Sequence, residues 1–189
     1  MRAHTNNDEG LDRLEAFLVS DPANAEWFDF EPFGFAIERE NRIDPTRLDA
    51  EAFLDRLCSL DALTFGPEGM PMPRWLFYEA SALPGGIFGF AIRAERLEGP
   101  VRERLRVPAR AGGLVPLSMY IAIPADPPGV WYGHNLASLN RVAPELGLSG
   151  LATITKAVGL RCFRCAEQLG ATQWASRALH VHKIGRAHV

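Results

Sequence analysis

The stretch Leu114–Pro124, which reads LVPLSMYIAIP, decides the fold. It is an almost unbroken apolar run, rich in Leu, Ile, Met and Tyr, and it is too short to span a membrane. Such a run is typical of a β-strand that is buried on both faces, because the side chains of both faces then lie in the core. We therefore expect Leu114–Pro124 to be the central strand of a sheet.

A helix is expected after this strand, over Gly147–Gln168 (GLSGLATITKAVGLRCFRCAEQ). Its apolar residues recur at steps of three and four, the spacing of one helix face. They are Leu151, Ile154, Val158, Cys162, Cys165 and Leu169. Glycines open the helix, and the amides at a helix N-terminus attract anions. A buried strand, a loop and such a helix together indicate a site for a phosphorylated ligand.

Shorter elements are expected around these two. Arg74–Ala80 (RWLFYEA) and Gly86–Arg93 (GIFGFAIR) are apolar, aromatic runs on either side of a Pro-Gly-Gly turn, which predicts a β-hairpin. Further expected elements are an extended segment over Trp27–Ile37, a helix from Asp44-Pro45 to about Leu60, a short helix over Gly99–Val107 and a short strand over Gly170–Trp174. The predicted fold is α+β, with a single mixed, mostly antiparallel sheet flanked by helices.

The composition is that of an ordinary globular protein. Of the 189 residues, 47% are hydrophobic and 23% are charged, and the net charge is −3. We expect one domain over residues 1–182, with residues 1–7 disordered. Because the sequence shows no apolar leader and no apolar run long enough for a membrane span, we expect a cytoplasmic protein that does not associate with membranes.

The last residues, 183–189 (KIGRAHV), match the in-frame translation of a widely used sequencing adapter. We therefore expect them to be non-native and the natural chain to be truncated near His182. The basic residues between Arg93 and Arg110 alternate with Glu95, Glu98 and Glu103, the pattern of a solvated face, so nucleic-acid binding is not expected.

Metal and redox chemistry have little support in the sequence. The three cysteines, Cys58, Cys162 and Cys165, are an odd number and do not predict a disulfide framework. Cys162 and Cys165 form a C-x-x-C deep inside the expected helix, where packing is the favoured interpretation. No second cysteine pair or spaced histidine pair completes four ligands, so no metal site is predicted.

The order of elements resembles the GNAT superfamily of acyl-CoA-dependent N-acyltransferases. In that family a central strand ends in V-x-P, for which Ile121–Pro124 (IAIP) is the counterpart here, and a glycine-rich loop cradles the CoA pyrophosphate, matched by Gly147–Gly150 (GLSG). The family also carries a late N-x-x-A-x-x-x-Y motif whose tyrosine protonates the leaving thiolate, and His182 stands at that tyrosine position. The resemblance spans most of residues 28–182.

The resemblance implies an activity, a co-substrate and a set of roles. The chain would move an acyl group from acetyl-CoA or another acyl-CoA to an amine of a small molecule or protein. The pyrophosphate would bind at Gly147, Ser149, Gly150 and Leu151, and the pantetheine arm at Ile123. The acceptor would bind at Tyr120, Trp131, Tyr132 and Asn135. The catalytic candidates are Glu79, His134 and His182. Glu79 would be a base on the hairpin, and His182 the acid.

Two alternatives remain open at this point. Trp131, Tyr132, His134 and Asn135 combine aromatic faces with hydrogen-bonding groups, a mixture typical of small-molecule sites. The first alternative is therefore a non-catalytic protein that binds an apolar or aromatic small molecule in a cleft near Trp131–His134 and Met119. The second is an enzyme of another type, with His134 and Asp126 as acid and base.

Overall fold

A computed structural model of the chain describes residues 13–82 and 84–170. Its centre is a six-stranded sheet of order β2-β1-β3-β4-β5-β6. The strands are β1 (Glu15–Val19), β2 (Arg42–Ile43), β3 (Gly86–Arg93), β4 (Leu114–Ala125), β5 (Val130–Ser138) and β6 (Glu167–Gly170). The strands from β1 through β3 and β4 to β5 pair antiparallel, whereas β2 and β6 pair parallel to their neighbours. The predicted α+β class with a mixed, mostly antiparallel sheet is confirmed.

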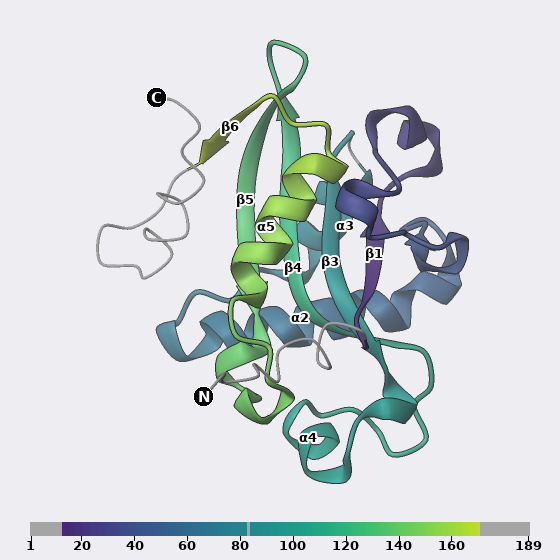
Figure 1. The fold of residues 1–189 in the computed structure, drawn as a ribbon, viewed down its shortest axis with the longest axis vertical. Coiled ribbons are helices and arrows are strands. Elements are labelled where there is room, and N and C mark those ends of the chain that lie inside the picture. The colour runs from purple at the N-terminus through teal and green to yellow at the C-terminus, as the bar shows by residue number, and fades with distance from the viewer. Residues whose placement is uncertain (1–12, 83, 171–189) are drawn as a thin grey trace, which may run out of the picture.

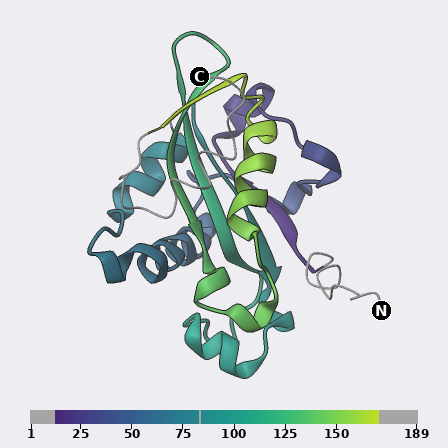
Figure 2. The same cartoon turned by 60° about the vertical axis from the view of Figure 1, so that its left-hand side comes forward.

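Helices cover both faces of this sheet. They are α2 (Glu51–Phe65), α3 (Arg74–Ala82), α4 (Gly99–Arg104) and α5 (Leu151–Cys162). Helices α2 and α3 lie on one face and α5 on the other, with α4 beyond the strand ends (Figures 1 and 2). Short 3-10 helices fill the connections: η1 (Pro22–Trp27), η2 (Pro32–Gly34), η3 (Arg39–Asn41), η4 (Leu48–Ala50), η5 (Gly66–Glu68), η6 (Ala94–Arg96), η7 (Leu139–Arg141) and η8 (Pro144–Leu146). Within the described ranges, no helix has the length and apolarity needed to cross a bilayer.

The expected central strand is confirmed in β4. It lies between β3 and β5, and residues Leu114–Ala122 are buried. Helix α5 is fastened to β4 by a buried hydroxyl pair, Ser118 Oγ and Thr155 Oγ1, 2.6 Å apart. Thr155 Oγ1 also donates to the Leu151 carbonyl at 2.7 Å. These contacts fix the first turns of α5 against the sheet.

The predicted hairpin is wrong in its first arm. Arg74–Ala82 forms helix α3, and only Gly86–Arg93 is a strand. Phe77, Ala80 and Ser81 are buried, at steps of three and four, so the aromatic run buries one helical face instead of pairing as a strand. Ser81 Oγ donates to the Phe77 carbonyl at 2.7 Å within this helix. Glu79 is therefore an exposed helix residue and not a hairpin residue.

The predicted loop between the central strand and the main helix contains a whole strand. β5 pairs antiparallel with β4 through a tight connection, so Trp131, Tyr132, His134 and Asn135 lie on a strand. Its polar residues and Gly133 interrupt the apolar pattern by which a strand is detected. The main helix itself is confirmed over Leu151–Cys162, but Cys165 and Leu169 lie beyond its end.

Other boundaries also differ from the expectations. The segment over Trp27–Ile37 contains 3-10 turns, and the first strand is β1. Helix α2 begins at Glu51, because Asp44 closes a local turn by accepting from the Thr46 amide at 2.9 Å. The last strand begins at Glu167, earlier than expected. The expected features over residues 1–7 and 171–189, including His182 and the adapter-like tail, lie outside the described residues.

Candidate functional site

Strand β5 has a paired half and a half with a free edge. β6 pairs with it from Val130 to Gly133, where the last partner is Gly170. From His134 to Ser138, no strand of the described part of the chain pairs with this edge. Figure 1 shows β6 beside β5, on the side away from β4. We call the last described pair of this ladder, Gly133 and Gly170, the fork.

A β-bulge lies directly after the fork. Ile121 pairs with Asn135 and Ala122 with Gly133, so His134 is an extra residue in β5. An extra residue bends the strand and reverses the alternation of its faces. His134 and Asn135 are consequently neighbours on the same face of the sheet, the one that α2 and α3 cover. The ring of His134 packs edge-on against Tyr132, with centroids 6.4 Å apart.

A buried carboxylate lies beside the bulge. Asp61, in α2, is 1% exposed; its carboxylate accepts from the Met72 amide at 2.6 Å and from Asn135 Nδ2 at 2.7 Å. Asn135 Nδ2 also lies 3.0 Å from Met72 Sδ. Burial raises the pKa of Asp61, while these hydrogen bonds and the nearby His134 oppose the rise. Asp61 thus ties the loop between α2 and α3 to the bulge.

The N-terminus of α5 lies at the end of the free edge. Gly150 caps the helix with φ of 82°, a left-handed conformation that favours glycine. Leu148 and Leu151 are buried, whereas Gly147, Ser149 and Gly150 are exposed. The first amides of a helix have no acceptor within it and attract anions. The predicted pyrophosphate residues therefore lie together on an accessible helix end.

Basic side chains surround this loop. Arg104 Nη1 donates to the Val142 carbonyl at 3.0 Å and pairs with Glu145 at 2.5 Å. The pairing neutralises the one carboxylate of the loop; the pKa of Glu145 is lowered by hydrogen bonds from its backbone and from Arg104. A small pocket of about 140 Å³ next to the loop is lined by Arg13 and Arg96 and also by Glu98 and Glu145.

The other predicted site residues are divided between the two faces. Trp131 and Tyr120, 2% and 1% exposed, are core residues on the α5 face, where Trp131 stacks on Phe163 with centroids 5.0 Å apart. Tyr132 and His134 are exposed on the opposite face. The single aromatic cleft that the small-molecule alternative places near Trp131–His134 is therefore not formed.

Two further predictions are corrected by the strand pairing. Ile123 lies opposite Tyr132 inside the β4–β5 ladder, so its edge toward β5 is already occupied. Among the described residues, the outer edge of β5 from His134 to Ser138 is unpaired. Asp126 lies at the tip of the β4–β5 connection, about four strand positions from His134, or roughly 13 Å. Asp126 and His134 are thus too far apart to act as an acid-base pair.

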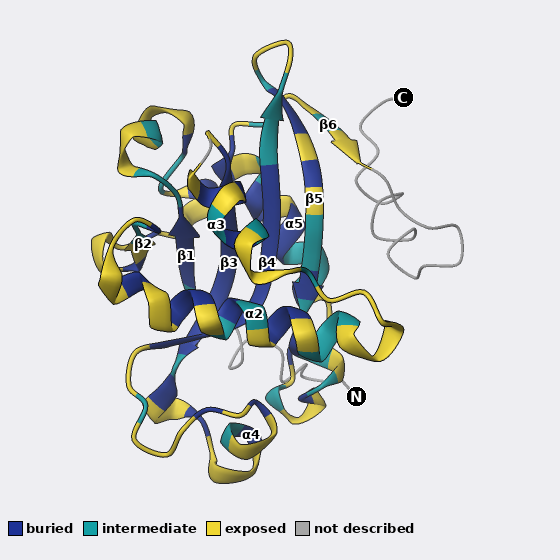
Figure 3. Ribbon diagram, turned by 180° about the vertical axis from the view of Figure 1, so that it is seen from behind, coloured by how far each residue is buried: buried dark blue, intermediate teal, exposed yellow. Residues whose placement is uncertain are grey.

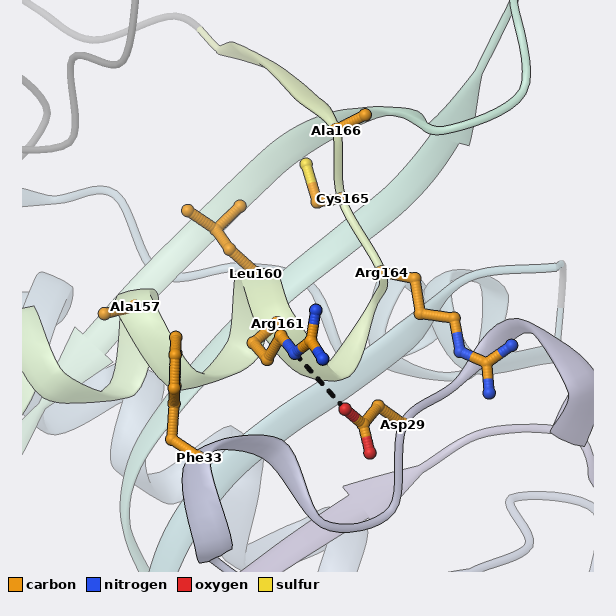
Figure 4. A pocket seen from close by; sticks show the side chains of 8 residues that line it. All are labelled: Asp29, Phe33, Ala157, Leu160, Arg161, Arg164, Cys165 and Ala166. Atoms are coloured by element: carbon orange, nitrogen blue, oxygen red, sulfur yellow. Dashed lines mark ion pairs between the residues drawn. The ribbon is translucent and has the colours of Figure 1, made fainter.

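An open pocket of about 780 Å³ lies outside α5, along its C-terminal half (Figure 4). The 70% exposed side chain of Phe33 stands beside Ala157 and Leu160. Arg161 Nε and an oxygen of Asp29 lie 3.4 Å apart across the pocket. The pocket combines an aromatic face with cationic side chains, and Asp29 and Cys165 also line it.

The cysteines are free thiols. Cys162 is fully buried, and burial raises its pKa; burial also raises the pKa of Cys165. A raised pKa keeps both thiols protonated, which agrees with a packing role and disfavours thiolate chemistry. Within the described residues there is no cluster of three or more His, Cys, Asp or Glu that could hold a metal ion.

Comparisons with protein-family models, with curated proteins and with solved structures find no match for this chain. The site therefore rests on its own geometry.

One residue of the site, Asp61, was missed in the sequence. A signal for it was present, because Asp61 follows Phe53, Leu57 and Leu60 on the buried stripe of α2. An acidic residue at an apolar helix position indicates a buried carboxylate with a specific partner.

Proposed function

We propose that the protein is an acyl-CoA-dependent N-acyltransferase, with an amine as acceptor. The observation that carries the proposal is the unit β5, loop, α5 and β6. In the described part of the chain, β6 pairs with Val130–Gly133, and β5 has a free edge from His134 to Ser138. β5 then runs into a loop that ends at a glycine-capped helix N-terminus.

This unit matches the shape of an acyl-CoA. The amides of Ser149, Gly150 and Leu151 would hold the pyrophosphate, and Arg13 and Arg96 lie near enough to the loop to attract further phosphate. The free edge from His134 to Ser138 spans roughly 13 Å, a length along which the pantetheine arm can pair with strand amides and carbonyls. The thioester would then reach the fork.

The element order also favours this family when the strands are reassigned. The elements follow the order expected from the resemblance, with β5 as the strand before the loop. They are β1, the α2 and α3 helices, the β3–β4 hairpin, β5, the loop, α5 and β6.

The chemistry follows from the α2 face of the fork. The amine nitrogen of the acceptor attacks the thioester carbon, the carbon–sulfur bond breaks, and CoA leaves as the thiolate. His134 is the base that takes the proton from the attacking amine, because it is exposed at the fork. Asp61 and Asn135 position the bulge and the loop over Gly66–Pro73 around it.

The test is a thermal-shift titration with CoA and acetyl-CoA. A ligand at about a hundred times its Kd adds roughly 2.7 kcal/mol, which raises the melting temperature of a chain this size by roughly 5–10 °C. Ser149→Glu should abolish the shift, because its carboxylate repels phosphate at the helix N-terminus. Ala157→Glu is the matched control, with the same charge in the exposed middle of the same helix. No shift with either ligand would contradict the proposal.

A second candidate function is the binding of a small anionic aromatic molecule without catalysis. The pocket at Phe33, Arg161 and Arg164 favours it. In that case Phe33→Ala would weaken the binding of the anionic aromatic molecule, whereas Ser149→Glu would leave its affinity unchanged.

A further inference from the structure

The hydroxyl group of Tyr120 is buried and has no hydrogen-bond partner among the described residues. The residue is 1% exposed, in the middle of β4. A phenylalanine would fill the same space without the cost of removing a hydroxyl from water. An unpaired hydroxyl in a core position therefore points to a partner outside the described residues.

The hydroxyl lies at the fork. A side chain built on Gly133 would bring its first carbon within 2.5 Å of Tyr120 Oη and 2.7 Å of Gln168 Nε2. The hydroxyl of Tyr120 thus lies next to Gly133, the last described residue of β5 that pairs with β6. Only glycine at position 133 leaves the hydroxyl room there.

The two faces of the fork carry different groups. Tyr120 Oη is on the α5 face, and His134 is on the α2 face, one residue beyond Gly133. A group that enters the fork along the free edge of β5 passes between them. Burial raises the pKa of Tyr120, so the hydroxyl keeps its proton and acts as a donor.

We propose that Tyr120 Oη donates a hydrogen bond to the acyl carbonyl of the bound thioester, and so fixes the carbonyl for attack from the His134 side. This inference rests on the proposed acyltransferase function. It makes Tyr120 a residue that distinguishes an acylated CoA from free CoA, because free CoA has no carbonyl at that position. A donor aimed at the carbonyl oxygen also stabilises the negative charge that develops there during attack.

The test compares the affinities of acetyl-CoA and CoA for the wild type and Tyr120→Phe by calorimetry. We expect Tyr120→Phe to weaken acetyl-CoA binding about tenfold and to leave CoA binding unchanged, which is the effect of one hydrogen bond. Without ligand, Tyr120→Phe should melt no lower than the wild type. Tyr78→Phe is the control and should change neither affinity, because the exposed hydroxyl of Tyr78, on α3, accepts from Arg74 away from the fork.

A second measurement does not depend on the variant folding. Acetyl-CoA labelled with ¹³C at the carbonyl should show a downfield carbonyl shift when it binds to the wild-type protein, as a carbonyl does on accepting a hydrogen bond. An unshifted carbonyl resonance in bound acetyl-CoA would overturn the inference.

The outcomes separate the two proposals. If the wild type binds CoA and acetyl-CoA, and Tyr120→Phe binds each of them with the affinity of the wild type, the proposed role of Tyr120 is wrong and the acyltransferase proposal stands. If the wild type binds neither, the acyltransferase proposal is overturned, and the inference about Tyr120 with it.

Discussion

The two faces of β5 differ in what they do for the molecule. On the α5 face, Trp131 packs among Phe28 and Phe163, and all three are at most 2% exposed. On the α2 face, Tyr132 is 39% exposed and His134 is exposed, next to the buried carboxylate of Asp61. One strand thus supplies the core on one side and the polar groups of a site on the other.

The difference arises from how the helices cover the sheet. Helix α5 lies on its own face of β3, β4 and β5, whereas α2 crosses the strands of the other face and leaves part of β5 uncovered (Figure 3). The bulge at His134 then places a second polar residue on this face, beside Asn135. A polar side chain avoids the cost of burial where it is exposed, as His134 is, or where it is hydrogen-bonded, as Asn135 is to Asp61.

The largest expected effect tests the structural face. Trp131→Ala should lower the free energy of unfolding by about 3–5 kcal/mol, because it leaves a cavity between β5 and Phe163. Tyr132→Ala, its neighbour on the other face, should cost about 1 kcal/mol or less. Urea unfolding of both variants gives the values. Equal losses would mean that the two faces do not differ in the way described.

A smaller effect is expected at Asp61. Asp61→Ala should cost about 1–3 kcal/mol of stability, because the Met72 amide and the Asn135 side chain lose their acceptor. Asp55→Ala, at an exposed position of the same helix, is the control, since an exposed ion pair adds little. Urea unfolding measures both variants, and a loss at Asp61 no greater than that at Asp55 would contradict the structural role.

Asp61 also predicts a pH dependence. Burial raises its pKa above the ordinary 3.8, so the native state keeps the proton to a higher pH than the unfolded chain does. The stability that this proton contributes is present below about pH 4 and is lost as the pH rises through the raised pKa. The wild type should therefore lose stability relative to Asp61→Asn over this range. A difference between the two proteins that stays constant with pH would argue against the raised pKa.

The smallest effect compares thiols on the two faces. Burial raises the pKa of Cys58, at the edge of α2, to about 11, whereas Cys162 on α5 is fully buried. Alkylation of Cys58 should accelerate about tenfold per pH unit up to that pKa, because the thiolate is the nucleophile. Cys162 should react only as fast as the protein opens. Mass spectrometry of the labelled peptides distinguishes them, and equally fast labelling would show that the α5 face is not closed.

The sequence predicted elements where one physical signal dominates. β4 was recognisable because every side chain in most of its length is apolar, and α5 because its apolar stripe and opening glycines agree. The glycines and Ser149 at its N-terminus were placed correctly for the same reason. Strand β5 and helix α3 were not predicted correctly. Polar residues and Gly133 interrupt the apolar pattern of β5, and α3 begins with an aromatic-rich run that is typical of strands.

By itself, therefore, the sequence determined the α+β class, the buried strand β4 and the glycine-capped helix α5, because these follow from local patterns of hydrophobicity and capping. Only the tertiary structure decided that β5 carries the free edge, that its bulge turns His134 and Asn135 toward Asp61, and that Tyr120 reaches the fork. These features depend on strand register and on contacts between residues far apart in the chain, such as Asp61 and Asn135. A single inserted residue reverses the faces of a strand, and no local sequence pattern indicates it.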